Sequence, residues 1–470
     1  MNKKKEYVKN TCILLIGKFV TQFMSLFLLP LYTHYLLSAD YGLVDLYQTY
    51  ISLFVPVFLL CLDSAVFRFL IDSRNNKEEK EKIISSAVIK TSIQAILFAI
   101  IFFIISLFVK IQYYQYIIVN VILIMFSNIF LQICRGEGKN VNYSIACIIT
   151  GTITLISNLI LIIGFKFGAS SILISSSLAN LCCIIFIFIS MKLYKIIDFR
   201  KHSKDTEKSL TKYSVPLIPN ALSWWIVNVS DRTIISIVIN TAANGIYTVS
   251  CKFSNILNSV FSIFTMSWQE SASLHINDED KDEFFSSMIN NIYTFFTLIS
   301  ISLIFIVTIA FKILIGDQYL DAYNYIPILI LANSFNVLIG LFGGIYIAKK
   351  LTKKMTSTTI VSAIINLIIN IALINFIGLY AACFSTLISY FTMAIYRYFD
   401  VQKYVKVKIY LKTIVTSIVS FITAFIAYYY NNIIISILLF MMILGFIFIF
   451  NIKTIKKYYN TVLMKIKKNK

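Results

Sequence analysis

Residues 213–272 read YSVPLIPNALSWWIVNVSDRTIISIVINTAANGIYTVSCKFSNILNSVFSIFTMSWQESA, and this stretch decides the fold. It consists of two apolar runs joined by a short turn at Asn244 and Gly245. As a helix, at about 1.5 Å per residue, each run is long enough to cross a hydrocarbon core of about 30 Å. The stretch therefore predicts two consecutive transmembrane helices.

The whole chain has the composition of a membrane protein. Of its 470 residues, 58% are hydrophobic, and the mean hydropathy is +0.80. Repeated long apolar stretches exclude a soluble globular protein and predict an all-α polytopic membrane protein. The formal charge of +20 does not indicate a nucleic-acid partner, because the basic residues lie in short segments between apolar runs.

About fourteen transmembrane helices are expected, and the longer ones must tilt or kink. The expected spans are 10–36, 42–70, 83–109, 113–134, 141–165, 168–191, 213–240, 244–271, 284–315, 323–348, 355–376, 378–398, 411–430 and 432–452. The segment MNKKKEYVKN runs directly into a span too long for a signal-peptide core, so no cleaved leader is expected.

Lys and Arg gather in alternate loops and in both terminal segments, including KKLTKK (349–354) and the Arg397–Lys412 region. The opposite loops hold only Lys110, Lys166 and Lys312. Cytoplasmic loops of membrane proteins are enriched in Lys and Arg. Both termini are therefore predicted to be cytoplasmic.

An internal repeat is visible in the turns. SADYGLV (38–44) and TAANGIY (241–247) share the pattern Ser/Thr-Ala-x-x-Gly-aliphatic, and FKFGASS (165–171) is echoed by NFIGLYA (375–381). The near-equal offsets predict two six-helix lobes with the same orientation, related by a pseudo-two-fold axis along the membrane normal. The expected divisions are an N-lobe 1–195, a cytoplasmic inter-lobe loop 196–212, a C-lobe 213–400, and a helix pair with a basic cytoplasmic tail 401–470.

Charges inside spans are candidate functional groups, because each costs about 2.5–3.5 kcal/mol on insertion scales. Arg232 and Lys252 lie on the order of 18 and 12 Å from the turn between their helices, at similar depth. They could flank one anionic group, with Asp231 as partner or titrating site. The alternative is that Asp231 simply neutralises one of the two cations.

The first half of the chain adds Lys18 and Arg68 near the inner side, where snorkelling to the interface is the alternative role. Asp63 lies deeper, as a proton or cation site or a counter-charge to Lys18. Its i,i+5 spacing from Arg68 disfavours a direct bridge. Asp45 is expected to be solvated near the outer turn, and Lys90 is expected to snorkel.

Four residues at the start of the seventh predicted span have two interpretations each. Pro216 and Pro219 could form a hinge that bends the helix, or they could mark an irregular start of the span. Trp224 and Trp225 could stack on the rings of a bound ligand or pack against neighbouring helices.

Five segments carry a resemblance to a known family: LLPLYTHYLLSADYGLVDLY (28–47), RGEGKN (135–140), PLIPNALSWWIVNVSDRTIIS (216–236), GIYTVSCKFSNIL (245–257) and NLIINIALINFIGLYAACFSTLISY (366–390). The chain resembles the Wzx-type polysaccharide biosynthesis flippases of the multidrug/oligosaccharidyl-lipid/polysaccharide (MOP) exporter superfamily, over essentially its whole length. One departure is Glu137, where an apolar residue is expected.

The resemblance implies two six-helix lobes around a central cavity, with two extra helices. It implies alternating-access transport of an undecaprenyl-pyrophosphate-linked oligosaccharide from the inner to the outer leaflet of the bacterial cytoplasmic membrane. Arg232, Lys252, Lys18 and Arg68 would bind the pyrophosphate, and Asp231 or Asp63 would couple H⁺ or Na⁺. If the alternatives given above for the prolines and tryptophans hold, Trp224 and Trp225 would stack on sugar rings and Pro216 and Pro219 would form the hinge between transport states. Membrane lipid, a polysaccharide polymerase and glycosyltransferases of the pathway are the implied partners.

Other classes fit the sequence less well. RGEGKN lacks the spacing of a phosphate-binding loop, and no catalytic constellation, cofactor or metal site is expected, so the chain is not predicted to be an enzyme. A membrane polysaccharide polymerase would need a larger outer loop than GDQYLDAYN (316–324). A lipid II flippase and a cation-coupled multidrug exporter stay open as alternatives, as do O-antigen, capsule, exopolysaccharide and teichoic-type products.

Overall fold

The computed structural model describes residues 24, 27–430, 434, 437–443 and 445. Within these residues every regular element is a helix, and no strand is present. The prediction of an all-α polytopic fold is confirmed. The first and last expected spans, 10–36 and 432–452, lie mostly outside the described residues.

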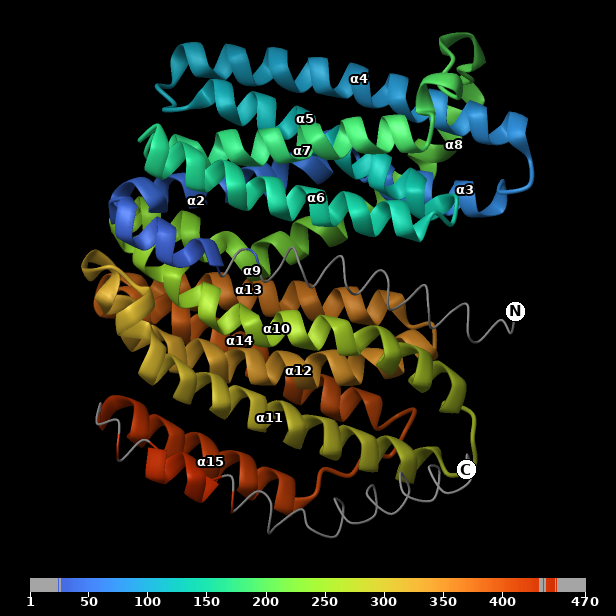
Figure 1. Cartoon of the computed structure of the whole chain (residues 1–470). Coiled ribbons are helices and arrows are strands. Elements are labelled where there is room, and N and C mark those ends of the chain that lie inside the picture. The colour runs from blue at the N-terminus through green and yellow to red at the C-terminus, as the bar shows by residue number, and fades with distance from the viewer. Residues whose placement is uncertain (1–23, 25–26, 431–433, 435–436, 444, 446–470) are drawn as a thin grey trace, which may run out of the picture. The chain divides into compact units, whose positions relative to one another are not determined.

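Each of the other expected spans corresponds to one described helix, except 42–70, which corresponds to two (Figure 1). The elements are α2 (Ser38–Phe58), α3 (Leu62–Asp72), α4 (Lys77–Phe108), α5 (Tyr114–Gly136), α6 (Asn140–Leu159) with the π-helical turn η1 (Ile160–Gly164), α7 (Ser170–Ser190), η2 (Leu193–Lys195), η3 (Phe199–Lys201), α8 (Lys204–Ser214), η4 (Val215–Leu217), α9 (Ile218–Val238), α10 (Thr241–His275), α11 (Lys281–Leu314), η5 (Asp317–Tyr325), α12 (Ile326–Ala348), α13 (Thr352–Ile377), α14 (Leu379–Val401) and α15 (Leu411–Tyr430).

Nine of the described helical segments are long and apolar enough to cross a membrane, and the bent pair α2 and α3 makes a tenth. Helices α9 and α10, of 21 and 35 residues, are also long enough to span but carry more polar side chains. These two helices are the ones encoded by the stretch 213–272. Their polar side chains indicate that part of each helix faces protein or water rather than lipid.

The second expected span, 42–70, is broken rather than continuous. Helices α2 and α3 meet at an angle of 50°. Pro56 lies inside α2 and cannot donate to the carbonyl one turn earlier. Leu60 and Cys61 then adopt left-handed backbone angles, with φ of 54° and 51°. The break places Asp63 in the first turn of α3.

The described chain forms two compact units. One comprises the chain up to Thr248 together with Ile315–Tyr319, and the other comprises Val249–Leu314 and the chain from Leu320 onward. The lobe boundaries expected from the sequence stay a prediction. In the first unit α7 packs against α5 and α6, α5 against α3 and α4, and α2 against α9.

In the second unit α14 packs against α12 and α13, and α11 packs against α12 and α15. Glycines on α12 permit close packing by aromatic side chains of α10. A Cβ at Gly340 would lie 2.3 Å from the Phe261 ring, and one at Gly344 would lie 2.4 Å from Nε1 of Trp268. Trp268 donates a 2.9 Å hydrogen bond to the carbonyl of Leu341. The core of this unit is therefore fixed by side-chain shape as well as by apolar burial.

Arg397 was expected among the solvated cytoplasmic charges, but it is only 1% exposed. Its guanidinium donates to Oγ1 of Thr358 at 2.8 and 3.1 Å and to the carbonyl of Ile339 at 3.0 Å. It also donates to the carbonyl of Met355 at 3.2 Å. The side chain thus ties α14 to α12 and α13, and it is a structural element of this unit.

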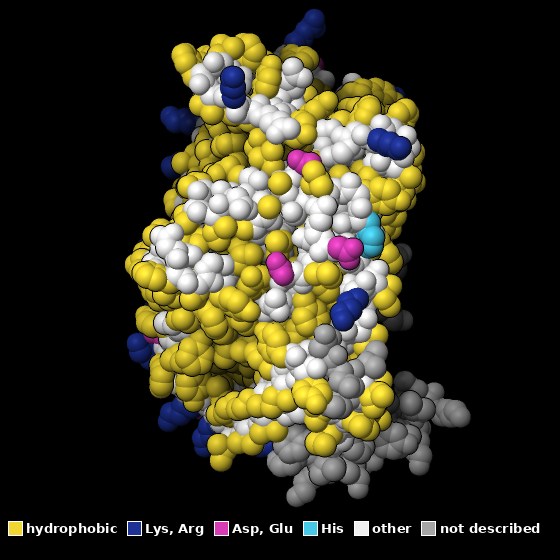
Figure 2. All heavy atoms as spheres, turned by 90° about the vertical axis from the view of Figure 1, so that its left-hand side faces the viewer, with side chains coloured by type: hydrophobic (Ala, Val, Ile, Leu, Met, Phe, Trp, Pro, Cys, Tyr) yellow, Lys and Arg dark blue, Asp and Glu magenta, His cyan; other side chains and the backbone are white. Residues whose placement is uncertain are grey.

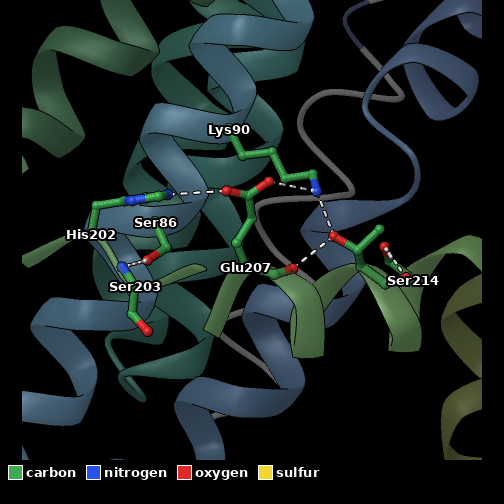
Figure 3. Close-up of polar contacts among 7 residues, drawn as sticks. Ser86, Lys90, His202, Ser203, Glu207 and Ser214 are labelled. Atoms are coloured by element: carbon green, nitrogen blue, oxygen red, sulfur yellow. Dashed lines mark hydrogen bonds and ion pairs between the residues drawn. The ribbon is translucent and has the colours of Figure 1, made fainter. Parts of the chain in front are cut away.

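The inter-lobe segment is folded rather than extended. Helix α8 packs against α3 and α4, and Figure 3 shows the polar contacts that hold it. Glu207 of α8 accepts a 3.1 Å hydrogen bond from Nζ of Lys90 and lies 3.0 Å from Nε2 of His202. Lys90 also donates to Thr211. Lys90, which was expected to snorkel, pairs with a carboxylate 117 residues away in the chain.

One end of the helices carries little charge. The turns between α4 and α5 and between α6 and α7 lie at the left in Figure 1, and Figure 2 shows that side with only scattered Lys and Arg side chains. This agrees with the sequence, in which the loops on one side of the predicted spans hold few Lys and Arg residues. The cytoplasmic location of the termini stays a prediction.

Candidate functional site

The two copies of the glycine repeat contact each other within the first unit. A Cβ at Gly42 would lie 1.8 Å from the carbonyl oxygen of Thr241, and one at Gly245 would lie 2.2 Å from the carbonyl oxygen of Ser38. Asn244 donates a 2.7 Å hydrogen bond from Nδ2 to the carbonyl of Gly42. Only glycine permits this approach of backbones. The repeat motif therefore encodes the crossing of α2 and the first turns of α10.

Beside this crossing lies a buried ion pair. Asp45 of α2 is 3% exposed, and its Oδ2 lies 3.2 Å from Nη1 of Arg232 on α9. Thr248 of α10 donates a 2.7 Å hydrogen bond to the same carboxylate oxygen, and Thr49 lies 3.3 Å from Nη1 of Arg232. The expectation that Asp45 is solvated is wrong, because α9 and α10 cover it and supply its partners.

Sequence reasoning missed Asp45, Thr49 and Thr248 as members of this cluster. A signal was present, because Asp45 and Thr248 are separated by the same 203 residues as the two repeat motifs. Residues at equivalent positions of a two-fold repeat meet when they lie near the axis. The repeat was seen in the sequence, but this consequence was not drawn from it.

Asp231 is also buried, at 3% exposed, and accepts a 3.0 Å hydrogen bond from the hydroxyl of Tyr247. Arg232 forms its ion pair with Asp45. Both interpretations of the sequence had instead considered Asp231 as the carboxylate beside Arg232 and Lys252. Lys252 is half-buried on α10, one turn after Thr248. The joint role of Arg232 and Lys252 at an anionic group stays a prediction.

The two tryptophans differ in their surroundings. Trp225 donates a 2.9 Å hydrogen bond from Nε1 to the carbonyl of Thr49, so its ring fixes α9 against α2 beside the ion pair. Trp224 is half-buried on α9. Pro216 lies in the short helix η4, and Pro219 lies in the first turn of α9. This is an irregular start of the span, and stacking on sugars and a hinge role stay predictions.

The remaining predicted residues lie apart from this cluster or outside the described chain. Arg68 is exposed and pairs with Asp72 at 2.6 Å, an i,i+4 contact on α3. Asp63 is half-buried after the break between α2 and α3. Lys18 lies outside the described residues. Glu137, the departure from the family pattern, pairs with Lys80 at 3.0 Å, so a charge there is satisfied locally.

A short segment fixes the chain at the start of α2. Oε1 of Gln318 accepts a 3.3 Å hydrogen bond from the amide of Ser38, and the hydroxyl of Tyr319 donates to the carbonyl of Leu36 at 3.0 Å. These bonds satisfy backbone groups at a helix end that has no side-chain cap. This end of α2 is thus held by α9, α10 and the segment 315–319 together.

Helix α10 continues into the second unit with a polar face. Exposed polar side chains recur along it at near-helical spacing, at Asn255, Ser262, Glu270 and Ser273. Polar groups on a membrane-spanning helix avoid lipid and face protein or a water-filled path. The first unit therefore contributes a buried ion pair, and the part of α10 in the second unit contributes a polar helix face.

The fold belongs to a known class of membrane transporters. The lipid II flippase MurJ in an inward closed conformation matches with a TM-score of 0.71 and 19% identity, over 94% of this chain and 100% of that chain. An inward-facing multidrug resistance MATE family transporter of the MOP superfamily matches with a TM-score of 0.68 and 12% identity, over 83% and 98%. A Vibrio cholerae MATE transporter matches with a TM-score of 0.58 and 12% identity, over 85% and 96%.

The family is given by the sequence itself. A family model described as polysaccharide biosynthesis protein matches residues 7–269, more than half of the chain. The chain therefore belongs to the polysaccharide biosynthesis protein family. No curated protein matches the chain. Family and fold together confirm the resemblance to Wzx-type flippases of the MOP superfamily.

Proposed function

We propose that this protein is a flippase for an undecaprenyl-pyrophosphate-linked oligosaccharide. It moves the glycan from the inner to the outer leaflet of a bacterial cytoplasmic membrane, with both of its own termini in the cytoplasm. The observation that carries the proposal is the polysaccharide biosynthesis family match over residues 7–269. The likeness to a structure described as a lipid II flippase supports the same kind of transport.

The buried charges support an anionic substrate. Arg232 lies in the membrane-spanning part of the first unit, where a cation is kept only if it is paired or used. In this conformation Asp45 neutralises it. A pyrophosphate offers more charge and more acceptor oxygens than one carboxylate, so it can compete for the guanidinium. Asp45 then acts as the counter-ion of Arg232 when no substrate is bound.

This exchange suggests how transport is coupled. When the pyrophosphate takes Arg232, the Asp45 carboxylate loses its cation, and a buried charge without a partner is costly, so Asp45 joins the residues proposed for H⁺ or Na⁺ coupling. Asp231 and Asp63 are the other carboxylates proposed for H⁺ or Na⁺ coupling. Lys252, Lys18 and Arg68 complete the proposed set of cations. Alternating access of the two units then carries the glycan across while the prenyl chain stays in lipid.

The test is reconstituted transport with three substrates. Proteoliposomes containing the full chain receive lipid-linked oligosaccharide extracted from the source cells, lipid II, or a cationic dye, and arrival in the opposite leaflet or lumen is measured. We expect only the extracted lipid-linked oligosaccharide to move. Transport of lipid II alone would assign the chain to the other flippase activity, and transport of the dye alone would assign it to multidrug export.

Variants test the two cations directly. Arg232→Ala combined with Lys252→Ala should abolish transport, and Arg232→Lys should retain part of it because the charge remains. Lys77→Ala is the matched control, since the Lys77 side chain is 88% exposed. Full transport by the double alanine variant would remove both residues from the proposed site.

A further inference from the structure

The first unit contains a second polar region, separate from the ion pair. A cavity of about 420 Å³ lies among α2, α5 and α7, within the usual range of about 300–1,000 Å³ for small-molecule sites. Five of its lining residues are polar and uncharged: Gln48, Ser52, Asn120, Asn128 and Ser176. Among the lining residues that the structure describes, none is ionisable.

Two of these residues are fixed within the protein. Asn120 is 1% exposed, and its Nδ2 donates to the carbonyl of Leu173 at 2.6 Å and to Oγ of Ser177 at 2.9 Å. Its Oδ1 accepts a 2.8 Å hydrogen bond from Ser176. The amide of Asn120 therefore holds α5 to α7 and orients the hydroxyl of Ser176, whose oxygen can still accept a hydrogen bond.

The amides of Gln48 and Asn128 are different, because neither makes a hydrogen bond to any described residue. Gln48 and Ser52 lie one turn apart on α2, and Pro56 follows one turn later. Because Pro56 has no amide hydrogen, the carbonyl of Ser52 lacks its usual helical donor. The cavity is thus lined by two side-chain amides that make no hydrogen bond to a described residue, and it lies beside the helical turn of α2 that Pro56 interrupts.

We propose that this cavity binds an uncharged sugar residue of the transported glycan, an inference that rests on the proposed function. A sugar hydroxyl both donates and accepts hydrogen bonds, and a side-chain amide can satisfy both, because its NH₂ group donates and its carbonyl oxygen accepts. The C–H faces of a sugar ring would contact Ile51, Val55 and Ile124, which also line the cavity. Among the described lining residues an ion would find no counter-charge, and a prenyl chain would leave the half-buried amides of Gln48 and Asn128 unpaired.

The position of the cavity suits a lipid-linked glycan. Gln48 follows Asp45 by one turn of α2, and Ser52 follows it by two, which corresponds to about 5 and 10 Å along the helix axis. A pyrophosphate that displaced Asp45 from Arg232 would therefore place the adjoining sugars beside these residues. The cavity is thus assigned to the sugars nearest the pyrophosphate.

The test compares two probes on the full chain in lipid nanodiscs. One is undecaprenyl pyrophosphate without sugar, and the other is the lipid-linked oligosaccharide extracted from the source cells. Wild-type protein should bind the glycosylated probe more tightly. In the double variant Gln48→Ala with Asn128→Ala, the ratio of the two affinities should fall about tenfold, because two neutral hydrogen bonds to the sugar are removed. The affinity of this variant for undecaprenyl pyrophosphate should be unchanged.

The variants are expected to fold, since neither amide makes a hydrogen bond to a described residue, and the thermal unfolding temperature checks this. Gln115→Ala, on the exposed start of α5, is the matched control. An unchanged preference in the double variant would overturn the proposal. Equal loss for both probes would also overturn it, because the residues would then act on the lipid head. Wild-type protein that binds neither probe would refute the proposed function itself, and this inference with it.

Discussion

Thr248 donates a 2.7 Å hydrogen bond to Asp45, and the two residues occupy equivalent positions of a repeat with an offset of 203 residues. Gly42 and Gly245 have the same offset and also lie in close approach. Contacts between equivalent positions place the local two-fold axis of the repeat between α2 and the start of α10. An asymmetric feature, the Asp45–Arg232 pair, is built beside this symmetric crossing.

The ion pair gives the first prediction. Arg232→Ala should reduce the free energy of unfolding by about 3–5 kcal/mol, because it leaves the Asp45 carboxylate buried without its cation. Asp45→Asn combined with Arg232→Gln should be more stable than Arg232→Ala, since neither residue is then charged. Denaturant titration of the purified variants measures both. Equal stability of the wild type and Arg232→Ala would show that the pair is not held in the folded protein.

The glycine crossing gives the second prediction. Gly42→Ala and Gly245→Ala each insert a Cβ into backbone atoms, at 1.8 and 2.2 Å, so α2 and α10 must separate. We expect a loss of at least about 1–3 kcal/mol, as in overpacked cores. Gly164→Ala is the control, because nothing lies within 4 Å of its added Cβ. Thermal unfolding of the three variants should rank the control closest to wild type.

The helices were predictable because a membrane span needs about 20 apolar residues, a signal that needs no knowledge of neighbours. The partners of charged residues were not predictable in the same way. Lys90 and Glu137 each pair with a residue on another helix, Glu207 and Lys80 respectively. Depth along a span does not reveal such contacts, because they depend on how helices pack.

The break in the second span was likewise not predicted from the sequence. Pro56 was its only local signal, and Leu60 and Cys61 take up left-handed angles without glycine or asparagine. Asp45 was misplaced for a related reason, since nearness to a turn was equated with exposure. In this protein the turn is itself covered by Gly245 and Asn244 of the second repeat. Repeats therefore carry information about contacts as well as about topology.

The folded inter-lobe helix gives a pH prediction. Burial alone would raise the pKa of Glu207, but hydrogen bonds from His202 and Lys90 outweigh it, so the pKa of this carboxyl is lowered. A lowered pKa contributes stability that is present above the unfolded value, about 4.3, and is lost as the pH falls below it. Docking of α8 on α4 should therefore weaken as the pH falls below about 4.

Hydrogen exchange of residues 204–214 across this range measures the docking. Glu207→Gln should raise exchange at pH 7 and remove the acid dependence, because the variant carries no titrating group at this position. Glu78→Gln is the control, since that side chain is 74% exposed and pairs with Lys82 on the surface of α4. An acid dependence that persists in Glu207→Gln would assign the effect to another group.

Arg397 gives the last prediction, because a buried guanidinium without its full set of acceptors is costly. Its planar fork reaches Thr358, the carbonyl of Ile339 and the carbonyl of Met355 at once, and Lys cannot reproduce that geometry. Arg397→Lys should therefore lower the free energy of unfolding by at least about 2 kcal/mol, with each lost bond worth about 1.5–3 kcal/mol. Thr358→Val, which removes the acceptor of two of these bonds, should have a similar effect, whereas Thr423→Val removes a bond within α15 to the carbonyl of Val419 and should change little. If Arg397→Lys unfolds at the same denaturant concentration as the wild type, the guanidinium network does not hold α12, α13 and α14 together.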